Sequence, residues 1–168
     1  MILGHHALLG FIDTMFPKMA PIKVGAASVD VRVGNEIMTE SGVKIGIHQY
    51  TEDNPWLMGP GAFLLVSMLE HTVVPRDMAC LFLLKSTQAR MGMSHSFAGW
   101  IDPGWDGILT MELKNYNQER PLQLWPGMPI GQLIYMRTLD DGQCYGGRYQ
   151  HSEGVVGALP EVEYDAGK

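Results

Sequence analysis

Polar and apolar residues alternate along two segments of this chain. In residues 27–35 valines alternate with polar side chains, and in residues 109–115 Glu112 lies on the polar side of a similar pattern. A period of two places successive side chains on opposite faces of a β-strand. Two further segments, residues 63–74 and 78–85, are almost continuously apolar, which is typical of buried strands. The four segments therefore predict a hydrophobic core built mainly from strands.

Glycine and proline mark turns between the predicted strands. The first apolar strand is expected to bend at Glu70, and residues 122–137 predict a hairpin that turns at Pro126-Gly127. Residues 1–16 have apolar side chains at mixed helical spacings, which predicts one short amphipathic helix. Because the strands are short, the turns frequent and the helical periods few, we expect an all-β barrel or a jelly-roll-like fold.

The length of the chain fits a single domain. Its 168 residues can bury a real core, and the sequence has no linker, internal repeat or low-complexity segment. We therefore expect one domain over residues 1–168, with a glycine-rich, acidic tail from about residue 140. Such a small domain with one site often oligomerises.

The charge and the cysteines narrow the class of protein. A formal net charge of −6 without a basic run argues against a nucleic-acid groove. The apolar N-terminus is too short for a membrane span and lacks the charged region of a signal peptide. Cys80 and Cys144 have no metal-binding spacing and are expected to be reduced thiols. The sequence thus predicts a cytoplasmic protein that binds neither nucleic acid nor a membrane.

Cations and hydroxyl groups gather just after the second apolar segment, at Lys85, Ser86, Thr87 and Arg90. Lysine and arginine donate hydrogen bonds that suit phosphate oxygens. Hydroxyl groups, together with loop N–H groups, can complete such a cradle. These residues are therefore a candidate phosphate-binding loop.

Two carboxylates follow this loop. Asp102 precedes Pro103-Gly104, a turn that can leave the acid at the end of a strand. Glu112, on the polar face of its strand, could act as a general base toward a site lined by the loop. The alternative is an ordinary surface glutamate on a half-exposed strand.

The residues around these groups form a series of motifs. Residues 85–92 read KSTQARMG, residues 98–115 read AGWIDPGWDGILTMELKN, and residues 121–137 read PLQLWPGMPIGQLIYMR. Together with ASVDVRVGN at residues 27–35 and GPGAFLLVSMLEHTVVPRDM at residues 59–78, this series closely resembles the dCTP deaminases, trimeric relatives of dUTPase. The resemblance covers most of the chain. It implies a dUTPase-like, distorted jelly-roll barrel that assembles as a homotrimer with shared active sites.

The resemblance implies hydrolytic deamination of dCTP to dUTP in pyrimidine deoxynucleotide metabolism. Glu112 stands at the family's catalytic position, where it would activate the water that attacks C4 of cytosine and return the proton to the departing ammonia. Ser86, Arg90 and the backbone near Ala98 would hold the water and polarise the ring. Asp102, at the sugar 3′-hydroxyl, completes the implied catalytic set.

The family pattern also implies a site for dCTP or dUTP. The backbone of residues 99–101 would read the pyrimidine edge, and Ile101 and Trp105 would exclude a 2′-hydroxyl. The implied nucleotide-binding residues are Lys85, Ser86, Thr87, Arg90, Ala98, Gly99, Trp100, Ile101, Asp102, Trp105, Tyr145, Arg148 and Gln150.

The chemistry implied by the resemblance needs no zinc. Zinc-dependent nucleobase deaminases combine H-x-E with P-C-x-x-C, and that combination is absent because Cys80 and Cys144 lie far apart. Mg²⁺ would arrive with the triphosphate and be bound mainly by phosphate and water, without a ligand from protein side chains. The adjacent His5 and His6 do not share a helix face and are expected to be surface residues.

Several positions differ from the pattern and leave other functions open. Lys85 stands where the family usually has arginine, and Phe97 replaces a residue that is usually threonine. Gly99-Trp100 resembles the residues found at these positions in bifunctional members of the family. Those enzymes also cleave the triphosphate and give dUMP. The alternatives are such a bifunctional enzyme, a dUTP diphosphatase in which Asp102 activates water, and a catalytically altered nucleotide-binding homologue.

The tail has two interpretations. Tyr145 can stack on a base beside Arg148, which carries a charge suited to phosphate, and this combination would suit a nucleotide lid. Alternatively, the tail lies on a neighbouring subunit.

Overall fold

The computed structural model describes residues 1–19, 21, 23–96, 98–140 and 142–160. Strands predominate in it, as the sequence predicts, and α1 confirms the short N-terminal helix. In chain order the elements are α1 (His5–Met15), β1 (Lys23–Val24), β2 (Val29–Thr39), β3 (Lys44–Gly46), β4 (Trp56–Met58), β5 (Phe63–Val73), β6 (Met78–Leu84), α2 (Ser86–Arg90), β7 (Met93–Ser94), β8 (Trp100–Ile101), β9 (Asp106–Asn115), β10 (Leu122–Leu124) and β11 (Pro129–Arg137).

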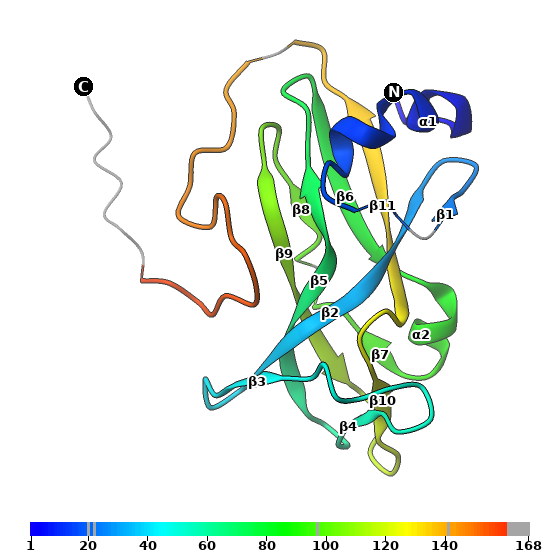
Figure 1. Ribbon diagram of the computed structural model, residues 1–168, viewed down its shortest axis with the longest axis vertical. Coiled ribbons are helices and arrows are strands. Elements are labelled where there is room, and N and C mark those ends of the chain that lie inside the picture. Colours follow the sequence, from blue (N-terminus) through cyan, green and yellow to red (C-terminus); the bar gives the residue numbers. More distant parts are fainter. Residues whose placement is uncertain (20, 22, 97, 141, 161–168) are drawn as a thin grey trace.

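The main sheet is antiparallel and curls into an open half-barrel (Figure 1). Its strands lie in the order β7-β9-β5-β2-β11-β6-β8, and β1 and β3 pair with β2 in addition. β4 and β10 form a separate two-stranded sheet. The ends of the main path are therefore β8 on one side and β9 with the short β7 on the other.

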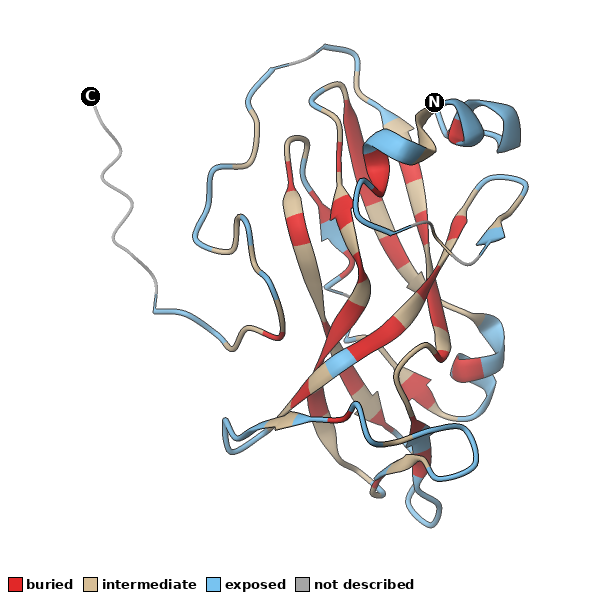
Figure 2. Ribbon diagram, in the orientation of Figure 1, coloured by how far each residue is buried: buried red, intermediate tan, exposed pale blue. Residues whose placement is uncertain are grey.

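The concave side of the sheet holds the core. Val29, Val31 and Val33 of β2 are fully buried, whereas Asp30 and Arg32 between them are only half-buried. Figure 2 shows buried positions spread along the strands of the sheet. The alternation in the sequence therefore predicted correctly which face of this strand packs inward.

β5 changes its pairing register near its centre. Its register with β9 shifts between Ser67 and His71, and the register of β2 against β5 shifts between Val33 and Ile37. Bulges of this kind bend a strand. The register shift against β9 therefore falls where the sequence predicts a bend, at Glu70.

The predicted hairpin over residues 122–137 is wrong. β10 pairs with β4, while β11 lies between β2 and β6 and pairs with both. Because both edges of β11 are occupied, β10 has no edge of β11 to pair with. The turn at Pro126-Gly127 exists, with Gly127 at φ 84°, but it carries the chain from the small sheet to the main one. Within the described ranges, neither helix has the length and apolar character needed to span a membrane.

Candidate active site

A pocket of about 770 Å³ lies where the curled sheet stays open. Its lining includes residues 98–102 around β8 and residues 108–112 of β9. β7 pairs with β9 only at Asn115 and Lys114, so the rest of that edge of β9 has no strand partner in the described structure. The pocket therefore lies between β8, at one end of the main sheet, and the largely unpaired edge of β9 near the other end.

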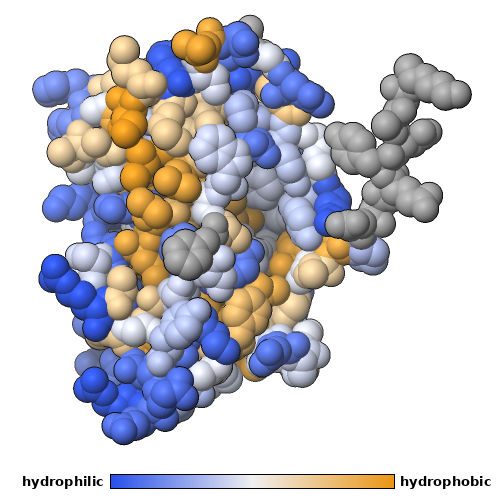
Figure 3. Space-filling view, turned by 180° about the vertical axis from the view of Figure 1, so that it is seen from behind, coloured by the Kyte–Doolittle hydropathy of each residue, from blue (hydrophilic) through white to orange (hydrophobic). Residues whose placement is uncertain are grey.

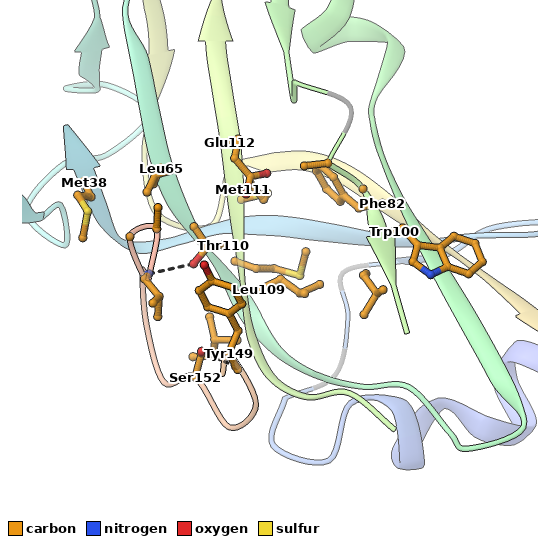
Figure 4. Close-up of a pocket in the computed structure, with 18 of the residues that line it drawn as sticks. Met38, Leu65, Phe82, Trp100, Leu109, Thr110, Met111, Glu112, Tyr149 and Ser152 are labelled. Carbon is orange, nitrogen blue, oxygen red and sulfur yellow. Dashed lines mark hydrogen bonds between the residues drawn. The ribbon is translucent and has the colours of Figure 1, made fainter. Parts of the chain in front are cut away.

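Glu112 projects from β9 into this pocket and is half-buried (Figure 4). Burial among side chains such as Leu65 and Phe82 raises its pKa above the ordinary value, and its own backbone amide lowers the pKa by a smaller amount. No other residue in the described ranges donates a hydrogen bond to the carboxylate. Such a group is poised to exchange a proton with a bound molecule.

Trp100 and Asp102 lie on the β8 side of the pocket. The Trp100 indole N–H donates to Asp102 Oδ1 at 2.8 Å. Both side chains are exposed and both line the pocket. Asp102 therefore has one oxygen held by a neighbour at the edge of the cavity.

The tail folds back onto the turn that precedes β9. The Tyr145 ring packs on buried Trp105 with centroids 5.6 Å apart. The Gln150 amide donates to the Gly104 carbonyl at 2.7 Å and accepts from the Asp106 N–H at 3.2 Å. Figure 1 shows this segment beside β9. Its position on its own chain, next to the pocket, favours the lid interpretation.

The predicted phosphate-binding residues lie outside the pocket. Residues 86–90 form the short helix α2 instead of a loop, with Ser86, Thr87 and Arg90 exposed. Lys85 Nζ lies 2.6 Å from Asp30 Oδ2. One chain therefore brings together the residues predicted at the base and sugar but not those predicted at the phosphates.

Two predicted tail residues do not line the cavity. Gln150 holds the turn as described, and Arg148 is exposed, with its guanidinium 5.4 Å from the centroid of the Tyr149 ring. The Arg148 guanidinium also donates to the Pro160 carbonyl. Phe97, which differs from the family pattern, lies outside the described residues.

The pocket also contains residues that the sequence analysis did not indicate. Thr110 shares the outer face of β9 with Glu112, and its hydroxyl accepts the Val156 N–H at 3.0 Å. The period of two along β9 was a signal that could have found Thr110. Leu65 carried no comparable signal, because its placement depends on strand register. Tyr149 and Ser152 (Figure 4) belong to the tail that the sequence offered as a lid, and the path of the tail brings them to the pocket.

The described part of the chain contains no group of three or more His, Cys, Asp or Glu arranged to hold a metal ion. One H-x-E spacing occurs, at His151 and Glu153, but both cysteines are far from it in sequence. His5 and His6 are exposed, as expected. This donor set fits a magnesium ion that is held by its nucleotide better than one that is resident in the protein.

Residues 5–138 match the sequence model of the dCTP deaminase-like family. This chain belongs to that family. A protein of Acidothermus cellulolyticus named "dCTP deaminase, dUMP-forming" is 43% identical over 109 residues, which cover 61% of this chain and 56% of the relative. A protein of Parafrankia sp. with the same name is 39% identical over 133 residues, covering 75% and 63%.

A third relative extends the match. A protein of Bifidobacterium longum, also named "dCTP deaminase, dUMP-forming", is 33% identical over an alignment of 179 positions, covering 96% of this chain and 88% of the relative. This dCTP deaminase-like chain thus spans less than two thirds of the first two relatives and most of the third.

Solved structures agree on the fold. The 2′-deoxycytidine 5′-triphosphate deaminase of Agrobacterium tumefaciens superposes with a TM-score of 0.65 at 17% identity, covering 82% of this chain and 48% of that one. The native dUTPase of EIAV gives 0.53 at 15% identity, covering 80% and 95%. The dUTPase-like fold expected for a dCTP deaminase-like chain is confirmed.

Proposed function

We propose that this chain hydrolytically deaminates dCTP and that the reaction continues to dUMP. The observation that carries the proposal is Glu112, a carboxylate of raised pKa that faces a pocket able to hold a nucleoside. The names of the relatives support the bifunctional alternative over release of dUTP.

The first step is addition of water to cytosine. Glu112 takes a proton from the water as the oxygen bonds to C4, and the proton then moves to the amino nitrogen. The C4–N bond breaks, ammonia leaves and uracil remains. A carboxylate with a raised pKa suits this double role, because the same group must accept and return a proton near neutral pH.

The residues of the β8 side would orient the base and the sugar. β8 has an open edge beside the pocket, so the backbone groups of residues 98–101 that do not bond to β6 are available to the pyrimidine. The Gly99 carbonyl is not among them, because it accepts the Phe82 N–H at 2.8 Å. Asp102, with one oxygen held by Trp100, would accept the sugar 3′-hydroxyl. Buried Trp105 and Ile101 form an apolar wall that leaves little space for a 2′-hydroxyl.

Formation of dUMP requires a second water, which attacks the α-phosphorus as pyrophosphate leaves. Asp102 is the candidate base for this step, because it is an exposed carboxylate that lines the pocket on the β8 side, next to the residues proposed to hold the sugar. Mg²⁺ carried by phosphate oxygens and water would neutralise the charge of the triphosphate.

We further propose a homotrimer in which a neighbouring subunit supplies α2 to each pocket. The outer face of β6 and β11 is apolar, with Leu81 directly opposite Ile134 and both only half-buried. Leu83 and Met136 lie on the same face by strand register. In the rear view of Figure 3, hydrophobic side chains form a band down the molecule. A second copy of this chain would cover such a face and bring Ser86 and Arg90 to the triphosphate.

Separate incubations with dCTP, dUTP and dCMP in the presence of magnesium test the proposal. Chromatography should show dUMP, pyrophosphate and ammonia from dCTP. Accumulation of dUTP alone would indicate a monofunctional deaminase. Turnover of dUTP without turnover of dCTP would indicate a dUTP diphosphatase, and nucleotide binding without any product would indicate an altered homologue.

A further inference from the structure

β2 contains a bulge beside the centre of β5, where the pairing register shifts between Val33 and Ile37. The Ser67 hydroxyl fills the gap by accepting the Glu36 N–H and donating to the Glu36 carbonyl, both at 3.1 Å. Ser67 is buried, so these bonds fix the backbone of Glu36. A bulge can re-aim a side chain, and the carboxylate of Glu36 reaches the C-terminal tail.

The carboxylate of Glu36 contacts two consecutive residues of the tail, Gly154 and Val155. Glu36 Oε2 accepts the Val155 N–H at 3.0 Å, and Val155 is fully buried. The preceding residue, Gly154, lies so close that a Cβ there would be 2.3 Å from the same oxygen. Any side chain at position 154 would therefore displace the carboxylate.

The next tail amide, that of Val156, is bound by β9, which lies on the opposite side of β5 from β2. The Val156 N–H donates to Thr110 Oγ1 at 3.0 Å, the bond drawn dashed in Figure 4. Val156, Gly157 and Ala158 then form part of the wall of the pocket that contains Glu112. Two consecutive amides are thus fixed by side chains of β2 and β9 at the point where the tail meets the pocket.

We propose that Glu36 is a positioning residue for the reaction: its carboxylate fixes the tail at Val155, so that residues 156–158 close one wall of the Glu112 pocket. Gly154 is the matching element of the tail, because it lets the backbone approach the carboxylate. The link to catalysis rests on the proposed function, whereas the contact itself does not.

Hydrogen exchange of the tail tests the contact without any substrate. Glu36→Ala removes the acceptor and should speed exchange of the amides at residues 155 and 156 by about 10- to 100-fold, the range expected for a hydrogen bond to a charged group. Glu36→Gln keeps a carbonyl acceptor and should restore most of the protection. Glu153→Ala removes an exposed carboxylate from the same tail and should change nothing. Unchanged exchange in Glu36→Ala would overturn the proposal.

A double-mutant cycle provides a second test. Gly154→Ala alone should release the tail as Glu36→Ala does, because the added carbon meets the carboxylate. In the Glu36→Ala background the same change should have little further effect. Gly146→Ala is the matched control, since a Cβ at that tail position would meet nothing within 4 Å. Additive effects of the two substitutions would contradict the proposed pairing.

Kinetics connect the contact to the reaction. Glu36→Ala should lower kcat/KM for dCTP by about 3- to 30-fold, Glu36→Gln should recover most of the loss, and the melting temperature should stay within a few degrees of the parent. If the parent does not turn over dCTP, the proposed function fails and the exchange experiments still decide the contact. If turnover is normal while Glu36→Ala leaves both exchange and kcat/KM unchanged, only the positioning role fails.

Discussion

Leu65 of β5 lies directly opposite Glu112 of β9 in the antiparallel ladder. Directly opposed residues share a face, with Cβ atoms about 4.5–5.5 Å apart. The aliphatic side chain therefore helps to keep water from the carboxylate. This contact contributes to the burial that raises the pKa of Glu112.

The contact between Leu65 and Glu112 should affect the pH dependence of deamination. Glu112 must be ionised to accept a proton, so kcat/KM should fall as the pH drops through the raised pKa. Leu65→Asn would hydrate the carboxylate, lower its pKa and move the acidic limb to lower pH. Leu57→Asn, at an exposed leucine of β4, is the control and should leave the limb in place. An acidic limb that does not move in Leu65→Asn would contradict this assignment.

Glu112→Gln should abolish deamination and leave nucleotide binding nearly intact. The amide keeps the shape of the side chain but cannot take a proton from water, and general acid–base catalysis is worth about 10²–10⁴-fold. Initial rates with dCTP and calorimetric binding of dUMP, which the enzyme does not consume, measure the two effects. Glu119→Gln, at an exposed glutamate, should retain full activity. Deamination within a few-fold of the parent would exclude the assigned role.

The same substitution should alter the pH dependence of stability. A pKa raised by folding means that the folded chain holds this proton more tightly than the unfolded chain does. The protonated Glu112 therefore stabilises the folded chain fully at a pH below its pKa in the unfolded chain, about 4.3. This stabilisation is lost as the pH rises through the higher pKa of Glu112 in the folded chain. Glu112→Gln should therefore be more stable than the parent at neutral pH, with the advantage shrinking toward pH 4. Urea titrations at several pH values measure this, and a constant difference would argue against a buried, titrating carboxylate.

The assembly should depend on the outer face of β6 and β11. Ile134→Glu places a charge opposite Leu81 and should dissociate the proposed trimer at micromolar concentration. Activity should fall with it, because the exposed Arg90 of α2 would no longer reach a neighbouring pocket. Val43→Glu, at an exposed valine between β2 and β3, should leave the assembly intact. Sedimentation velocity gives the state of each variant, and a fully active monomer would contradict the shared site.

Mixed assemblies test the shared site directly. Arg90→Ala should mainly weaken binding of the triphosphate, whereas Glu112→Gln removes the proton transfer. Trimers reassembled from both variants should contain some pockets with neither defect and should regain part of the activity. No recovery in verified mixed trimers would mean that both residues act in the same subunit.

Deamination should not require zinc. The described residues offer no cluster of ligands for it, so treatment with a strong zinc chelator, gel filtration and return of magnesium should restore full turnover of dCTP. Recovery that requires added zinc would overturn this prediction.

The sequence by itself determined the local features of this protein. The period of two along residues 27–35 and 109–115 indicates which side chains face the core, because successive residues of any extended backbone point to opposite sides. The same pattern places Thr110 beside Glu112 on one face. The motifs of residues 98–112 resemble those of the family to which the chain belongs. They also include the residues of β8 and β9 that line the pocket.

Only the tertiary structure decided which segments meet. β10 pairs with β4 and not with β11, although a turn joins it to β11. Glu36 and Val155 are 119 residues apart and form one hydrogen bond, and Leu65 meets Glu112 through the register of two strands. A local pattern specifies the orientation of side chains along a strand, but the partner of that strand is selected by the burial and hydrogen bonding of the whole sheet. For the same reason the sequence could indicate Glu112 but not the side chains that surround it.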